Sequence, residues 1–138
     1  MNFEITDNIN KEDEEHIFQG LLEYNLARIE DRNSRDIGVY IRNKDGNIVA
    51  GLTGDTHGNW LTIKYLWVSE ELRSQGVGSE ILKQAEEEAK KRGCKYSFLD
   101  TFSFQAPEFY KKYGYKEQFA LENYPITGKR YYFTKNLF

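Results

Sequence analysis

Apolar residues in the first quarter of the chain recur with a helical period. Ile17, Leu21 and Tyr24 are three or four residues apart, the spacing of one face of an α-helix. This pattern predicts a helix that begins near residue 11 and ends in the segment 31–34. Residues 1–6 alternate weakly between apolar and polar types, which predicts a short edge strand ahead of the helix.

The middle of the chain changes to a period of two. Apolar residues alternate with polar or small ones over 37–41, and the Asp45-Gly46 pair that follows is typical of a tight hairpin turn. Residues 48–53 provide a partner strand, and the glycines within 54–59 predict a second turn. Residues 60–68 are dense in β-branched and aromatic types. The sequence therefore predicts an antiparallel meander of three strands.

The second half of the chain mixes both periods. Residues 77–92 have a helical pattern with charged residues on one face, and 96–101 form a short apolar strand. A third, short helix is predicted over 107–113, followed by strands at 115–121 and 130–134. The order β-α-β-β-β-α-β-α-β-β indicates a mixed α/β (α+β) sheet with helices on its faces. We expect the whole chain to form a single domain.

Composition narrows the class of protein. The 138 residues carry a net charge of −3, which disfavours a nucleic-acid partner because phosphate binding usually needs a basic face. The single cysteine excludes an internal disulfide and a cysteine-based metal cluster, so we expect no metal. No stretch approaches the roughly 20 apolar residues that cross a bilayer. We expect a soluble, cytoplasmic protein without a membrane partner.

A glycine-containing loop between strand 60–68 and helix 77–92 carries the candidate chemistry. Its sequence is Arg73-Ser74-Gln75-Gly76-Val77-Gly78-Ser79. Glycines allow a ligand close to the backbone, and the free N–H groups at a helix start favour phosphate. A nucleotide P-loop would need Gly-Lys-Ser/Thr, which is absent, and a dinucleotide fingerprint would need glycine where Ile81 stands.

Two motifs give the chain a family resemblance. The residues 73–78 match the Arg/Gln-x-x-Gly-x-Gly/Ala signature of the GNAT acetyltransferase family. The segment 106–115 resembles that family's A-x-x-x-Y-x-x-x-G-F/Y helix, with Tyr110 at the tyrosine position. The order of the predicted elements also resembles the family from the first strand to about Tyr115.

The resemblance implies a GNAT fold with a largely antiparallel sheet, in which strand 60–68 splays from the parallel strand 96–101. It implies acetyl-CoA as donor and direct attack on the thioester by a primary amine of a small molecule or peptide. Tyr110 would protonate the leaving thiolate. The residues expected to bind acetyl-CoA are Leu66, Trp67, Val68, Arg73, Ser74, Gln75, Gly76, Val77, Gly78, Ser79 and Ser103.

The sequence departs from the family pattern at two positions. Thr62 stands where some members have a glutamate base, and Ser103 stands where many have asparagine. The identity of the general base is therefore open. We name Asp100 as the catalytic candidate, and the alternatives are His57, Tyr65 and a chain of waters.

Other functions remain as alternatives. The main one is a non-catalytic acyl-CoA-binding or regulatory module, and a toxin-like acetylation of aminoacyl-tRNA is disfavoured by the acidic balance. The aromatic C-terminal region is compatible with a homodimer.

Overall fold

The computed structural model describes residues 1–31 and 33–138. Its contacts divide the chain into two units, Met1–Arg32 and Asn33–Phe138. Within the described residues, no helix is long and apolar enough to cross a membrane.

The first unit contains one helix, α1 (Lys11–Leu26). Asn10 caps its N-terminus, because the Asn10 side-chain oxygen accepts hydrogen bonds from the backbone N–H groups of Glu12 and Asp13 at 2.8 and 3.3 Å. The helix ends earlier than predicted, since the N–H groups of the next residues turn back to the Asn25 carbonyl. Of the predicted end segment 31–34, residue 32 lies outside the described residues.

The predicted edge strand over residues 1–6 is wrong. These residues have no strand structure. The Thr6 hydroxyl instead accepts a hydrogen bond from the Asn8 backbone N–H at 3.0 Å, a local turn that competes with strand pairing. Two alternating apolar residues are too weak a signal to outweigh it.

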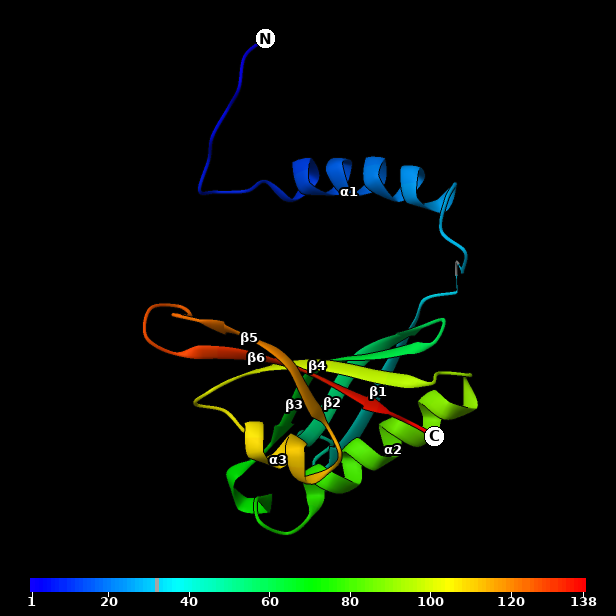
Figure 1. Ribbon diagram of the computed structural model, residues 1–138, viewed down its shortest axis with the longest axis vertical. Helices are drawn as coiled ribbons and strands as arrows, with labels where there is room; N and C mark the ends of the chain where they lie inside the picture. Colours follow the sequence, from blue (N-terminus) through cyan, green and yellow to red (C-terminus); the bar gives the residue numbers. More distant parts are fainter. Residues whose placement is uncertain (32) are drawn as a thin grey trace. The chain divides into compact units, whose positions relative to one another are not determined.

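The second unit is built on a mixed sheet, which confirms the predicted fold class. In the described chain the sheet has six strands in the order β1-β2-β3-β4-β6-β5 (Figure 1). Every neighbouring pair is antiparallel except β3 and β4, which are parallel. The strands are β1 (Arg35–Arg42), β2 (Ile48–His57), β3 (Trp60–Val68), β4 (Tyr96–Phe102), β5 (Lys116–Glu122) and β6 (Lys129–Asn136).

Strand β2 is longer than predicted, because Gly54 lies inside it and not in a turn. The register with β3 shifts between Thr53 and Gly54, which marks a bulge. A Cβ atom at Gly54 would collide with the backbone carbonyl oxygen of Thr62 on β3. Glycine is therefore needed here for close strand approach.

Helix α2 (Val77–Lys91) covers β1, β2 and β3 (Figure 1). It follows a short 3-10 turn, η1 (Glu70–Leu72), and a third helix, α3 (Pro107–Lys112), packs against β5. The apolar face of α2 is buried in the core through Ile81, Leu82, Ala85 and Ala89.

A buried polar network joins α2 to the second half of the sheet. The Tyr115 hydroxyl donates to Glu86 at 2.9 Å and lies 2.7 Å from the Ser97 hydroxyl on β4. Lys135 on β6 donates to the other Glu86 oxygen at 2.8 Å. Each polar side chain of this network therefore has a partner, which holds α2 in a defined position over the sheet.

Candidate active site

The site begins where β3 and β4 separate. Their parallel pairing joins Trp60 with Tyr96, Leu61 with Ser97 and Thr62 with Phe98. The described register ends there, although both strands continue. The predicted splay is thus present, and two cavities lie beside the C-terminal half of β3.

The first cavity has a volume of about 500 Å³ and lies between the end of β3, the start of α2 and α3. Nine of the residues expected to bind acetyl-CoA or act in catalysis line it: Leu66, Val68, Arg73, Ser74, Gly76, Val77, Gly78, Ser79 and Tyr110. Its walls also include Leu72, Ala106, Phe109, Lys112 and Tyr113. Trp67, Gln75 and Ser103 are not among its lining residues.

The start of α2 gives this cavity an anion-binding wall. Gly76 occupies the N-cap position with φ of +76°, and no side chain caps the helix in the described chain. The first intrahelical hydrogen bond runs from the Glu80 N–H to the Gly76 carbonyl. The N–H groups that precede Glu80 in the helix therefore have no intrahelical acceptor. Together with the helix dipole they fit a phosphate group.

Side chains of the loop brace its backbone. Arg73 Nε donates to the Val68 carbonyl at 3.0 Å, and Ser79 Oγ donates to the Gly76 carbonyl at the same distance. Gln75 Nε2 donates to the Glu71 carbonyl at 2.8 Å. These bonds connect β3, η1 and α2, so the loop shape is set by the chain itself.

The second cavity, about 400 Å³, opens in the splay between β3 and β4. Residues from β3 line one side: Ile63, Lys64, Tyr65, Leu66 and Trp67. Residues from β4 and the following segment line the other: Leu99, Asp100, Thr101, Gln105, Ala106 and Tyr110. Leu66, Ala106 and Tyr110 line both cavities, so the two meet at Tyr110.

Tyr110 is held rigidly at this junction. It lies on α3, is 9% exposed, and contacts the rings of Phe109 and Tyr115 edge-on at centroid distances of 5.2 and 5.9 Å. Burial raises the pKa of Tyr110 to about 12, and the charge of Asp100 adds to the effect. The phenol therefore carries its proton at neutral pH and can donate it.

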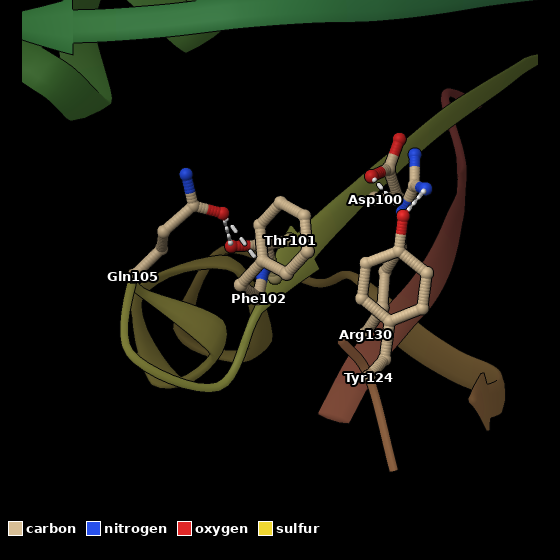
Figure 2. Close-up of polar contacts among 6 residues, drawn as sticks. All are labelled: Asp100, Thr101, Phe102, Gln105, Tyr124 and Arg130. Carbon is tan, nitrogen blue, oxygen red and sulfur yellow. Dashed lines mark hydrogen bonds and ion pairs between the residues drawn. The ribbon is translucent and has the colours of Figure 1, made fainter. Parts of the chain in front are cut away.

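Asp100 on β4 forms an ion pair across to β6. Its Oδ2 accepts from Arg130 Nε at 2.7 Å, and Arg130 also donates to the Tyr124 hydroxyl at 3.2 Å (Figure 2). The hydrogen bond to Asp100 raises the pKa of Arg130 above its usual value. The guanidinium is thus a permanent cation that orients the carboxylate.

The remaining candidates lie at different places. Tyr65 lines the second cavity but is 74% exposed. Thr62 closes the parallel pairing, and His57 pairs with Trp60 beside the turn of the β2–β3 hairpin; neither residue lines the first or the second cavity. Ser103 turns toward β6, where its hydroxyl accepts from the Lys129 N–H at 3.3 Å.

The sequence interpretation missed several lining residues. They include Lys64 and Gln105 in the second cavity and the large aromatic residues Phe109 and Tyr113 in the first. The two aromatics lie within the segment 106–115 that carries the second motif. Gln105 directly precedes that segment, which is the only sequence signal that could have identified it.

The chain is thus an α/β domain with a splayed strand pair and a helix start whose free N–H groups fit a phosphate. The family model of the acetyltransferase (GNAT) family matches residues 3–115, and the chain belongs to that family.

Relatives and a solved structure agree with this membership. Acetyltransferase Atu2258 of Agrobacterium fabrum is 41% identical, over 83% of this chain and 84% of the relative. The blasticidin-S acetyltransferase of Streptomyces morookaense is 35% identical, over 63% of this chain and 65% of the relative. The crystal structure of an acetyltransferase from Bacillus cereus has a TM-score of 0.83 and 34% identity, and covers 96% of this chain and 97% of that one. The protein is therefore an acetyl-CoA-dependent acetyltransferase.

Proposed function

We propose that the protein is an N-acetyltransferase that transfers the acetyl group to a primary amine of a small molecule or peptide. Acetyl-CoA would occupy the first cavity and the amine the second. The observation that carries this proposal is the position of Tyr110, which lines both cavities. A residue at the junction of donor and acceptor can act on the bond that breaks.

The donor side follows from the walls of the first cavity. The start of α2, with Gly76 and Gly78, would hold the pyrophosphate through backbone N–H groups. The splayed end of β3, at Leu66 and Val68, would receive the pantetheine arm. Cavity shape and donor chemistry therefore both fit acetyl-CoA.

The chemistry requires the amine nitrogen to lose two protons and the sulfur to gain one. An amine near pKa 10 is mostly charged at neutral pH, so it loses one proton to water before it can attack. As its nitrogen bonds to the acetyl carbon, the carbon–sulfur bond breaks, and Tyr110 would give its proton to the leaving sulfur. The nitrogen then loses its second proton, which Asp100, on the wall of the second cavity, would accept directly or through water and pass to solvent. Tyr110 recovers a proton from solvent.

Two further observations support an enzyme acting on amines over a non-catalytic acyl-CoA-binding module. A module that only binds acetyl-CoA has no need of a second cavity that meets the first at a protonated tyrosine. The name of the Streptomyces relative, blasticidin-S acetyltransferase, supports a small-molecule acceptor.

The test combines an amine screen with the substitution Tyr110→Phe. We expect kcat to fall by about 10²-fold, since general acid catalysis typically contributes that much, with the dissociation constant of acetyl-CoA nearly unchanged. Tyr40→Phe is the control, because Tyr40 is a half-exposed residue of β1 that lines neither cavity. Equal loss of turnover and acetyl-CoA binding in Tyr110→Phe would show that the ring is only structural.

A further inference from the structure

The Gln105 side chain has a defined orientation. Its Oε1 accepts from the Phe102 backbone N–H at 2.7 Å and from the Thr101 hydroxyl at 3.1 Å (Figure 2). A backbone N–H can only donate, so the side-chain atom that faces Phe102 must be the oxygen. The assignment of oxygen and nitrogen in this amide is therefore determined by its surroundings.

This orientation makes Gln105 a donor toward the cavity. With Oε1 occupied, the Nε2 group is directed away from Thr101 and Phe102 (Figure 2) and has two N–H bonds to offer. Gln105 lines the second cavity. The two N–H bonds of the Gln105 amide are thus available to a molecule bound in the second cavity.

Asp100 offers the opposite polarity on the same wall. Arg130 engages its Oδ2, and no contact with another described residue engages Oδ1. Asp100 and Gln105 both line the second cavity, as does Tyr110. One cavity thus combines a hydrogen-bond acceptor, a hydrogen-bond donor and the proposed catalytic acid.

We propose that Gln105 determines acceptor specificity by binding a carbonyl or hydroxyl oxygen of an amine whose nitrogen faces Asp100. This inference rests on the proposed function. The substrate class is then a primary amine that carries an oxygen acceptor near its nitrogen, such as an aminoalkanamide or the N-terminus of a peptide. A plain alkylamine of equal size would displace water from the Gln105 amide without replacing its hydrogen bond.

The substitution Gln105→Glu separates this role from support of the loop. Glutamate keeps an oxygen for the Phe102 N–H and the Thr101 hydroxyl, so the local structure is retained. It replaces the N–H donors with a second carboxylate oxygen, which repels a substrate oxygen and does not repel an alkyl group. Melting temperature and acetyl-CoA affinity should stay at wild-type values.

The experiment compares 3-aminopropanamide and 4-aminobutanamide with alkylamines of equal length, using kcat/KM per unprotonated amine. The wild type should prefer the amides. In Gln105→Glu, kcat/KM for the amides should fall at least about tenfold while that for the alkylamines does not fall. Gln118→Glu, the same change at an exposed position of β5, should leave both series unchanged.

Two results would overturn the inference. A wild-type enzyme that acetylates alkylamines as well as amides would show that Gln105 makes no contact with an oxygen. An equal fall for both series in Gln105→Glu would show that the residue only supports the loop. Failure to acetylate any amine in either series, with acetyl-CoA bound, would instead contradict the proposed function.

Discussion

At the scale of single residues, the proposed mechanism depends on the Tyr110 phenol, which must keep its proton at a pH where the acceptor amine has lost its own. Tyr110 is buried against aromatic neighbours, and this burial raises its pKa to about 12. An α-amino group has a pKa of about 8. Between these two values, the acceptor is a nucleophile and the tyrosine is still an acid.

This separation predicts the pH profile. With a peptide acceptor whose α-amino group has a pKa of about 8, kcat/KM should rise to pH 9 and then stay level to pH 11, because Tyr110 remains protonated. Steady-state rates at half-unit intervals, with acetyl-CoA affinity measured at each pH, test this. A fall centred near pH 10 would contradict the raised pKa.

A second residue, Ser69, has a buried hydroxyl that lowers the stability of the fold, and a substitution should remove this penalty. It follows β3 and is 9% exposed, and its hydroxyl has no hydrogen-bond partner among the described residues. It also makes no side-chain bond to the helical turn η1 that it precedes. Ser69→Ala should therefore raise the free energy of unfolding by about 1 kcal/mol, measured by urea denaturation.

The matched control for Ser69→Ala is Ser97→Ala. The Ser97 hydroxyl is fully buried but lies 2.7 Å from the Tyr115 hydroxyl, so its removal should lower stability by about 1 kcal/mol. If Ser69→Ala also lowers stability, its hydroxyl has a partner, such as a bound water.

At the scale of elements, the two ends of α2 use the same backbone conformation for different purposes. Gly76 at its start has φ of +76° and Gly93 beyond its end has φ of +92°. A Cβ atom at Gly93 would meet nothing within 4 Å, and one at Gly76 would only approach the Ser79 hydroxyl at 4.0 Å. Alanine at either position is therefore opposed by backbone strain and not by crowding.

These two glycines give a matched pair of substitutions. Gly76→Ala and Gly93→Ala should each lower the free energy of unfolding by about 1–2 kcal/mol. Only Gly76→Ala should also weaken acetyl-CoA binding, by about tenfold, because its backbone forms the anion-binding wall of the first cavity. Calorimetric titration with acetyl-CoA would measure this, and equal affinities in both variants would remove the loop from the binding site.

Individual elements also show where a sequence pattern is enough to predict the structure. The helix over 77–92 and the hairpin at Asp45-Gly46 were predicted because each signal is local. Gly54 misled the interpretation, since a glycine looks like a turn until the partner strand is known, and here the constraint is the Thr62 carbonyl on β3. Residues 1–6 show the converse, an alternation without a strand.

In the candidate site, too, some features could be predicted from local sequence and others could not. Short motifs singled out residues of the loop 73–79 and Tyr110, which the fold brings to one cavity, because each motif lies within one continuous segment of the chain. The ion pair of Asp100 with Arg130 joins residues 30 positions apart, and its partner choice depends on the register of β4 with β6. The Gln105 orientation depends on a backbone N–H of Phe102, which no residue pattern reports.

At the scale of the whole molecule, the tyrosine proposed to act in catalysis belongs to the aromatic core that stabilises the fold. Tyr110 and Tyr115 are both buried in the cluster that includes Phe133. Burial raises the pKa of each above the value of a free tyrosine, and the neighbouring Glu86 adds to the shift of Tyr115. The folded state therefore holds these two protons more tightly than the unfolded chain does.

This difference predicts a loss of stability at high pH. Below pH 10 both states are protonated, so the stabilisation is fully present, and it is lost as pH rises from about 10 through the folded pKa of Tyr110 near 12. For Tyr110 alone, the loss between pH 8 and pH 11 is about 1.4 kcal/mol. The wild type should therefore lose about that much more free energy of unfolding than Tyr110→Phe over this interval, measured by urea denaturation at both values.

Tyr40→Phe serves as the control for this comparison, because it removes a phenol that is half exposed and outside the core cluster. It should lose as much stability as the wild type between pH 8 and pH 11. If Tyr110→Phe did the same, the Tyr110 phenol would titrate alike in the folded and unfolded chain. The proton proposed for the leaving thiolate would then be no more firmly held than that of a tyrosine in water, and the level pH profile expected above pH 9 would lose its physical basis.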